Sequence, residues 1–200
     1  MTKRQESALK TRQRLLDVTH KLIKQNGFYK LSVEDITKNA GVAKGTFYIY
    51  FKHKEEIVLE ICKGLFQETQ LKLDEIKDSD ITDKIFLYFD CFINEVQGYQ
   101  IHIVREWIKG IVEKNFDNES MGIIKWHYDV EMLKKIFSNA VENKELKADT
   151  PVDTLVKIIL CELYGMLTVW CMTDNEFNPR IWTKKFCEIQ LKVILKGYLI

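Results

Sequence analysis

The sequence predicts an all-α protein, and two observations support that prediction. First, only 2 prolines and 9 glycines occur among 200 residues, whereas Leu, Ile, Lys and Glu are abundant. Neither of the two helix-breaking residues is frequent enough to separate the many short strands of a β fold. Second, apolar residues recur at helical spacing along most of the chain. A hydrophobic content of 46% supports one substantial core, or a small domain joined to a larger one.

The first expected helix runs from Ser7 to Asn26 and ends at Gly27. Its apolar positions recur at helical spacing: Leu15, Val18, Leu22 and Ile23. We expect this helix to pack as a scaffold over the two helices that follow it.

Two short helices joined by a glycine turn are expected next. Ser32 can cap the first of them, and Asp35 lies three residues later, at the second position of a variant capping box. Gly41 follows where the chain must leave this helix in a left-handed conformation, which costs a glycine little. A sharp turn between two short helices is the layout of a DNA-reading helix-turn-helix.

The second of these short helices has two contrasting faces. Phe47 and Phe51 are one turn apart and are expected to face inward, together with Ile36, Ala40 and Val42. The side chains expected to face solvent or a DNA groove are mostly hydrogen-bonding or cationic: Lys44, Thr46, Tyr48, Ile49 and Tyr50.

Residues from about Leu15 to Glu56 resemble the N-terminal domain of TetR-type transcriptional regulators. The matching stretches are LLDVTHKLIKQNGF and SVEDITKNAGVAKGTFYIYFKHKEEI. The glycine turn, the KGTFYIYF segment and the Lys-Glu-Glu run after it are more specific than a general helix-turn-helix pattern. Two departures are Ala43, where members of the family often have serine, and Thr19-His20, which we interpret as variation at the surface.

This resemblance implies which residues contact DNA. The positions that match contacts to the phosphate backbone or the groove are Lys44, Thr46, Tyr48 and Lys54. The positions that match residues close to base edges are Gly45, Ile49 and Tyr50. Together with Ser32, these are the candidate DNA-binding residues.

The rest of the chain predicts six further helices, which makes about nine in all. Their expected ranges are 54–76, 80–96 (or 82–96), 103–112, 120–143, 152–172 and 179–200. The resemblance implies a division into a helix-turn-helix domain at residues 1–53 and a helical effector-binding and dimerisation domain at residues 54–200.

The net charge of +1 conceals an uneven distribution of charge. Residues 1–60 contain 12 of the 30 Lys and Arg but only 7 of the 29 Asp and Glu, so this segment carries +5 and the remainder −4. A basic N-terminal part on an acidic body suits a protein that docks on DNA by one end.

The 5 cysteines indicate a reducing compartment. Cys62, Cys91, Cys161, Cys171 and Cys187 are odd in number and never form a CxxC pair, which argues against a disulfide framework or a structural zinc site. The N-terminus is polar, and no apolar run reaches the roughly 18 residues that a membrane span needs. We therefore expect a cytoplasmic protein without a signal peptide, a membrane segment, a metal or a cofactor.

A homodimer is expected because a palindromic operator needs two recognition helices on one face of DNA. The resemblance implies that residues 152–172 and 179–199 pair with their copies as a four-helix bundle. Gly165 could allow the close approach of two helices, flanked by Leu163, Met166 and Val169. Packing of these same residues within one chain is about as probable on sequence alone.

Aromatic side chains are concentrated in the C-terminal part, which holds all 4 tryptophans. Such side chains can line an apolar cavity with a few polar groups, although most aromatics in a helical domain are simply core. The candidates for an effector site are Tyr88, Phe92, Trp107, Trp126, His127, Tyr128, Tyr164 and Trp170.

The sequence offers no arrangement typical of an enzyme. The four histidines are isolated, and there is no HExxH pair, glycine-rich phosphate loop or nucleophile elbow. Glu162 interrupts the most apolar helix, where it either pairs with a cationic group or lies exposed at one edge. The predicted function is a dimeric repressor released from its operator by a small apolar or aromatic effector. The alternatives are a regulator controlled by a protein partner and a hydrophobic-ligand-binding module.

Overall fold

The computed structural model describes residues 2–27, 30–112, 121–173 and 176–200, with side chains except at positions 59, 62, 106, 107, 110–112 and 121–124. The chain divides into two compact units, Met1–Gln67 and Glu68–Ile200. Within the described ranges the regular structure is helical, apart from one isolated β-bridge between Leu146 and Leu199. The all-α prediction is confirmed.

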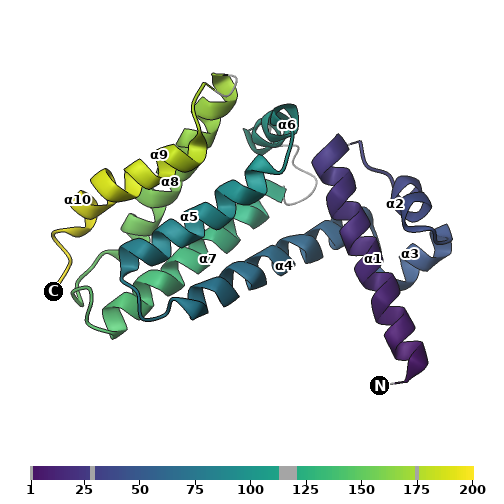
Figure 1. The fold of residues 1–200 in the computed structure, drawn as a ribbon, viewed down its shortest axis with the longest axis horizontal. Coiled ribbons are helices and arrows are strands. Elements are labelled where there is room, and N and C mark those ends of the chain that lie inside the picture. The colour runs from purple at the N-terminus through teal and green to yellow at the C-terminus, as the bar shows by residue number, and fades with distance from the viewer. Residues whose placement is uncertain (1, 28–29, 113–120, 174–175) are drawn as a thin grey trace. The chain divides into compact units, whose positions relative to one another are not determined.

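The N-terminal unit consists of α1 (Lys3–Asn26), α2 (Val33–Ala40), α3 (Lys44–Tyr50) and the first part of α4 (Lys54–Glu75), as Figure 1 shows. α1 packs against α2, and α2 against α3. The core of the unit contains wholly or almost wholly buried side chains from all four helices and the residue after α3: Leu15, Ile36, Phe47, Phe51 and Ile57. The expected scaffold role of the first helix is therefore confirmed.

α1 begins four residues earlier than the sequence predicted. Thr2 and Gln5 form a capping box, in which the Thr2 amide donates to Gln5 Oε1 (2.8 Å) and the Gln5 amide to Thr2 Oγ1 (3.3 Å). A second difference is that Thr19, interpreted from the sequence as a surface position, is wholly buried. The helix presents Thr19 to the same side as Leu15, one turn earlier, and this side faces the core.

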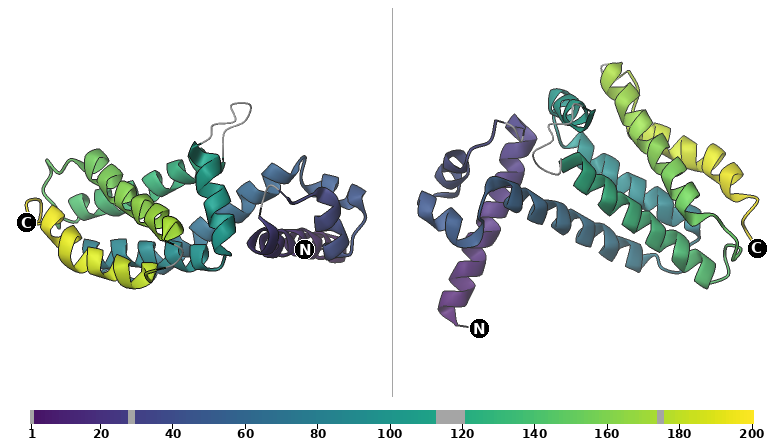
Figure 2. Two further views of the ribbon diagram at one scale, coloured as in Figure 1. Left: turned by 90° about the horizontal axis from the view of Figure 1, so that it is seen from above. Right: turned by 180° about the vertical axis from the view of Figure 1, so that it is seen from behind.

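The C-terminal unit contains α5 (Ile81–Gln97), α6 (Ile101–Val112), α7 (Met121–Glu142) and α8 (Val152–Met172). α9 (Pro179–Phe186), a π-helical turn (Cys187–Leu191) and α10 (Lys192–Leu195) follow as one continuous helical segment. Figures 1 and 2 show α5, α7 and α8 side by side, with α9 packed against α5 and α8. The last helix was expected to reach residue 200 but ends at Leu195, because the Tyr198 carbonyl accepts from the Lys147 amide (2.8 Å) and holds the chain in a turn.

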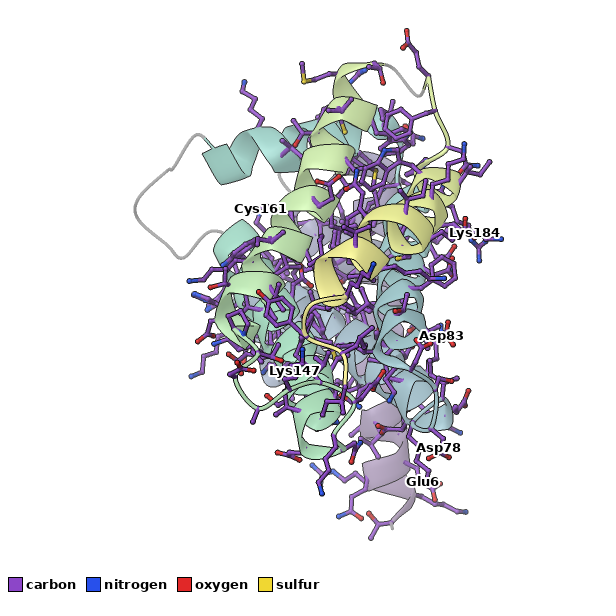
Figure 3. All side chains as sticks on the ribbon, turned by 90° about the vertical axis from the view of Figure 1, so that its left-hand side faces the viewer. Glu6, Asp78, Asp83, Lys147, Cys161 and Lys184 are labelled. Carbon is purple, nitrogen blue, oxygen red and sulfur yellow. The ribbon has the colours of Figure 1, made fainter. Side chains whose placement is uncertain are left out.

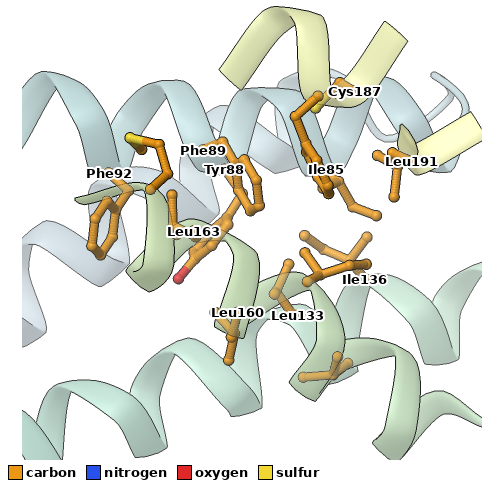
Figure 4. Packing of buried hydrophobic residues seen from close by; sticks show 14 of the residues in the cluster. Ile85, Tyr88, Phe89, Phe92, Leu133, Ile136, Leu160, Leu163, Cys187 and Leu191 are labelled. Carbon is orange, nitrogen blue, oxygen red and sulfur yellow. The ribbon is translucent and has the colours of Figure 1, made fainter. Parts of the chain in front are cut away.

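The core of the C-terminal unit draws side chains from every one of these helices. Figure 4 shows Tyr88, Phe89 and Phe92 of α5 beside Leu160 and Leu163 of α8. Phe89 also stacks on Phe186, and Phe186 on Trp182, with ring centroids 5.7 and 5.8 Å apart. The same figure also labels Ile85 of α5, Leu133 and Ile136 of α7, and Cys187 and Leu191 of the π turn.

Among the described residues, α8 is the one helix whose length and hydropathy would allow it to cross a membrane. However, 50% of its most apolar window is buried inside the protein, as in the core helix of a globular domain. Its buried side includes Leu155, Ile159, Leu163 and Leu167. This agrees with the expectation of a buried or interface helix.

Candidate functional site

The start of α2 is fixed by the capping box that the sequence predicted. The Asp35 amide donates to Ser32 Oγ (3.1 Å), and the Ser32 amide donates to Asp35 Oδ2 (3.1 Å). The Ser32 hydroxyl also donates to Asp35 Oδ2 (2.5 Å), and these bonds lower the pKa of the Asp35 carboxyl. Ser32, a candidate DNA contact, thus already has a local role in positioning the helix.

Gly41 makes the turn between α2 and α3 in the left-handed conformation, with φ 62° and ψ 40°. Its amide donates to the carbonyls of Lys38 and Thr37, and the Val42 amide donates to the Thr37 carbonyl (3.0 Å). A Cβ at Gly41 would meet nothing within 4 Å, so the glycine is needed for its backbone conformation and not for space.

The side chains of α3 alternate between the core and solvent as predicted. Phe47 is wholly buried and its ring lies 5.5 Å from that of Phe51, whereas Tyr48 is 51% and Ile49 76% exposed. The other candidate contacts of this helix are exposed (Lys44 and Gly45) or half-buried (Thr46 and Tyr50). Among the described large apolar side chains of the N-terminal unit, Ile49 is more exposed than Leu9 (54%) and Tyr48.

Two of the candidate lysines have partners within the unit. The Lys44 ammonium pairs with the Glu34 carboxylate of α2, which raises the pKa of Lys44 and lowers that of Glu34. The Lys54 ammonium donates to the Leu31 carbonyl (3.2 Å), next to the cap of α2. Both lysines are therefore positioned beside α2 and α3 before any ligand is present.

Arg12 belongs to the basic N-terminal segment, but its guanidinium is engaged inside the unit. It pairs with Glu60 of α4 (2.8 Å) and lies over the Phe51 ring, 5.2 Å from the centroid. The Arg12 guanidinium lowers the pKa of the Glu60 carboxyl. Arg12 thus connects α1 to α4 and to the end of α3.

The candidate effector residues of the C-terminal unit do not all lie together. Phe92, Trp126 and Tyr164 form one aromatic group: the Tyr164 ring is 5.9 Å from Phe92 and 5.7 Å from Trp126, edge to face in both pairs. Tyr88 is buried nearby, Trp170 is buried in the core, Tyr128 is half-buried and His127 is exposed. The side chain of Trp107 lies outside the described residues.

The polar centre of this aromatic group is Asp129 of α7, which is wholly buried. Its Oδ2 accepts from the Tyr164 hydroxyl (2.6 Å), and its Oδ1 pairs with the ammonium of Lys125, one helical turn earlier. The same ammonium lies 4.3 Å from the centroid of the Phe92 ring. We call Asp129, Lys125, Tyr164, Tyr88 and Phe92 the Asp129 cluster.

The Tyr88 hydroxyl is the least satisfied member of the Asp129 cluster. It is buried, and within the described residues no group meets normal hydrogen-bond geometry with it. Burial raises the pKa of Tyr88 well above its ordinary value, and the negative charge of Asp129 adds to this shift. The same two causes, burial first, raise the pKa of Tyr164.

Sequence reasoning missed Asp129 and singled out Glu162 instead, which the structure places half-buried on α8. A signal for Asp129 was present: Leu133 and Ile136 follow it by four and seven residues, so all three share one face of a helix. Because that face is apolar, Asp129 had to be buried. Within the described ranges, no three His, Cys, Asp or Glu residues lie together in a way that could hold a metal.

The chain is similar to known proteins at two levels. A family of regulators matches its N-terminal part, and individual proteins match most of its length. Residues 15–61 match the family described as bacterial regulatory proteins, tetR family. The chain is 25% identical over 168 residues to the fatty acid metabolism regulator protein of Bacillus subtilis (strain 168), covering 82% of this chain and 85% of that protein. It is 27% identical over 188 residues to the HTH-type transcriptional regulator QacR of Staphylococcus aureus, covering 92% and 97%.

A solved structure agrees with this at the level of the fold. The crystal structure of the transcriptional regulator FadR from Bacillus subtilis in complex with stearoyl-CoA matches with a TM-score of 0.67 and 23% identity. The match covers 88% of this chain and 96% of that chain. The helical body after the helix-turn-helix is therefore a fold that known transcriptional regulators share.

Proposed function

Because the chain is a TetR-type transcriptional regulator, we propose that it is a cytoplasmic homodimeric repressor that a small apolar or aromatic effector releases from a palindromic operator. The observation that carries the DNA-binding part is the exposed face of α3. There Lys44, Tyr48 and Ile49 stand on a helix that the Gly41 turn and the Phe47 anchor hold against α2.

The proposed division of labour on this surface is the one that the resemblance to TetR-type regulators implies. Lys44, Lys54, Thr46 and Tyr48 contact phosphates or the groove, which positions the unit without reading sequence. Gly45, Ile49 and Tyr50 approach base edges, where an apolar side chain such as Ile49 can contact a thymine methyl group. Ile49→Ala should therefore change which sequence is preferred, whereas the lysine contacts affect all sequences alike.

The test begins with selection of a binding sequence from a random pool of double-stranded DNA. A Lys44→Ala/Tyr48→Ala variant should then bind the selected sequence at least about tenfold more weakly, with a flatter salt dependence. Lys196→Ala, at an exposed position of the other unit, is the matched control and should bind as the unchanged protein does. Full-strength binding by the double variant, folded by circular dichroism, would refute the assignment of this face.

The dimer part of the proposal is supported by apolar side chains that α8 and the C-terminal helical segment leave uncovered. They are between 46% and 77% exposed: Ile158, Val169, Met172, Ile181, Ile189 and Val193. Monomeric proteins rarely expose so many large apolar side chains on neighbouring helices. The opposite faces of the same helices are buried in the chain's own core, as at Leu163, Phe186 and Leu191. Removing residues 179–200 would therefore unfold the unit, and point substitutions are the sharper test.

Two measurements test the dimer. Val193→Lys places a charge on the uncovered face and should halve the mass measured by sedimentation at micromolar concentration, whereas Leu71→Lys, at an exposed apolar position of α4, should not. Cys161 is exposed on α8 (Figure 3), one turn from both Ile158 and Gly165, so a short bismaleimide should join two chains there. A dimer that forms unchanged with Val193→Lys, or bismaleimide cross-linking that persists in Cys161→Ser, disproves this interface.

The effector part is supported by the aromatic group around Tyr164 and by what similar proteins bind. FadR from Bacillus subtilis has been crystallised with stearoyl-CoA, whose acyl chain is a long apolar group, in a body of the same fold. α4 belongs to both compact units, so a rearrangement in the body can be passed to the N-terminal unit by one helix. Two recognition helices must lie about 34 Å apart to enter successive major grooves, so a small rotation is enough to weaken binding.

Reciprocal coupling tests this part. An effector that prefers the non-binding arrangement by about 1–3 kcal/mol lowers operator affinity roughly 5- to 150-fold, and saturating operator must weaken effector binding by the same factor. Tryptophan fluorescence should follow the titration, since Trp126 lies in the aromatic group. Equal effector affinity with and without operator contradicts the mechanism and favours control by a protein partner.

A further inference from the structure

The Asp129 cluster places a carboxyl group where water does not reach it. Asp129 is wholly buried, and one of its oxygens is already bonded to the Tyr164 hydroxyl at 2.6 Å. Burying a carboxylate without a cationic partner costs several kcal/mol, so the second oxygen needs a positive charge beside it. In the structure that charge is the Lys125 ammonium.

The groups around the Lys125 ammonium are those expected in a binding site for an organic cation. It lies between a carboxylate oxygen and the face of the Phe92 ring, whose centroid is 4.3 Å away. Carboxylates and aromatic faces are the groups that attract ammonium ions in low-dielectric surroundings. Trp126 and Tyr164 provide further aromatic surface next to it, which suits the apolar body of a ligand.

The two members of the ion pair differ in how easily they move. The Asp129 side chain is 0% exposed and fixed by Tyr164, whereas the Lys125 side chain is 24% exposed and has a flexible four-carbon stem. A lysine of this kind can extend its ammonium into water at little cost. The exchangeable member is therefore the cation, and the fixed member is the carboxylate.

The sign of the fixed charge decides which ligand can replace the lysine. A cationic ligand restores the neutrality of the buried site after Lys125 leaves. An anionic ligand would have to share Lys125 with a carboxylate that cannot move away, and would be repelled by it. The buried Tyr88 hydroxyl, which has no normal hydrogen bond within the described residues, is a further polar group at this site that can turn toward the carboxylate or a ligand.

From these observations we propose that the Asp129 cluster binds the charged group of a lipophilic organic cation, an amine or quaternary ammonium, in place of the Lys125 ammonium. This proposal rests on the proposed function, in that it names the chemical class of the effector. It makes Asp129 the residue that selects cations over neutral and anionic molecules with the same apolar body.

The experiment compares three probes with one alkyl chain: decyltrimethylammonium, decanol and decanoate, each titrated calorimetrically into the full-length protein. The cation should bind most tightly. Asp129→Asn should weaken cation binding at least about tenfold and leave decanol within about twofold, because only the charge is removed. Asp153→Asn is the matched control, since Asp153 forms an exposed pair with Lys134 of the same helix α7, and it should change nothing.

Lys125→Met provides a second arm that does not depend on the folding of Asp129→Asn. Without the competing ammonium, cation binding should become several-fold tighter, and the cation should raise the melting temperature of this variant more than that of the unchanged protein. Equal cation affinity in the Asp129→Asn and Asp153→Asn proteins overturns the proposal. The proposal is also overturned if decanoate binds and Lys125→Met abolishes that binding. It is overturned as well if decyltrimethylammonium does not bind up to millimolar concentration. Binding of the selected DNA without any probe is measured in parallel, so failure of the cation site and failure of the regulator function are separate results.

Discussion

The helix-turn-helix surface and the core of the C-terminal unit each contain a lysine paired with a carboxylate, in opposite surroundings. Lys44 and Glu34 are both exposed, with side chains 53% and 63% accessible. Asp129 is not accessible at all, and Lys125 is partly so. An exposed pair contributes about 0–1 kcal/mol to stability, whereas breaking a buried one costs about 3–5 kcal/mol.

This difference indicates which member of each pair is available to a ligand. On the helix-turn-helix surface the lysine can leave Glu34 for a phosphate, because water solvates the carboxylate that remains. In the Asp129 cluster a carboxylate left without a cation costs several kcal/mol, so the member that a ligand can replace is the cation. The same two residue types therefore suit an anionic ligand in one unit and a cationic ligand in the other.

The largest expected effect tests the buried pair. Lys125→Met leaves Asp129 without its cation, so the free energy of unfolding should fall by about 3 kcal/mol. Lys134→Met, on the same helix as Lys125, removes the partner of the exposed Asp153 of α8 and should cost at most about 1 kcal/mol. Denaturant unfolding followed by circular dichroism measures both. If both variants lose the same free energy of unfolding, the buried pair and the exposed pair do not differ in their contribution to stability.

The double variant Lys125→Met/Asp129→Leu sharpens the same point. Replacing both members of a buried pair by apolar residues of similar size is often neutral or stabilising, so much of the stability lost in Lys125→Met should return. If the double variant is less stable than the single one, then the carboxylate itself stabilises the fold through Tyr164. That result would make the Asp129 cluster a structural feature more than a binding site.

The next effect, about 1–2 kcal/mol, concerns the turn that presents the exposed pair. Gly41→Ala should destabilise the protein by this amount, because φ is 62° and only the backbone conformation resists a side chain. Gly45→Ala, inside α3 with open space around its Cβ, should stabilise it by about 0.5–1 kcal/mol. Thermal unfolding of the two variants against the unchanged protein gives the comparison. Shifts of the same sign would contradict it.

The two regions also differ in how far the sequence predicted them. The capping box of Ser32 and Asp35, the left-handed Gly41 and the alternation along α3 depend on residues within four positions of each other, and all were predicted. The bounds of α8 were predicted too, because its flanking residues and apolar run mark them locally. What the sequence could not supply is contact between distant helices. Asp129 meets Tyr164, 35 residues away, and nothing near Asp129 in the chain reveals that hydroxyl.

The end of the last helix was missed for the same reason. The apolar spacing after Pro179 continues to the last residues, and the sequence therefore predicted one helix to residue 200. The structure ends it at Leu195, where Tyr198 and Ile200 bond to Lys147 and Glu145 of a distant loop. The DNA contacts and the effector site remain predictions, because they depend on molecules outside the chain.

The smallest expected effect tests the exposed pair. In Glu34→Gln the Lys44 ammonium no longer has to break an ion pair before it contacts a phosphate. Operator binding should therefore become about two- to fivefold tighter at low salt. The gain should shrink as salt is added, because salt screens exposed charges. Glu6→Gln, in the first turn of α1, removes one negative charge elsewhere in the same unit and is the control.

The pH dependence of this gain separates a local effect of Glu34 from a general effect of charge. The hydrogen bond from Lys44 is the main cause that lowers the pKa of Glu34 below its ordinary value of 4.5. Glu34 therefore stays ionised throughout the range from about pH 8 to about pH 6, and the ratio of the two affinities should be constant over it. Fluorescence anisotropy with the selected DNA measures this ratio. If Glu6→Gln increases operator affinity by the same factor, the loss of any negative charge strengthens binding. The release of Lys44 from Glu34 then makes no contribution to operator affinity.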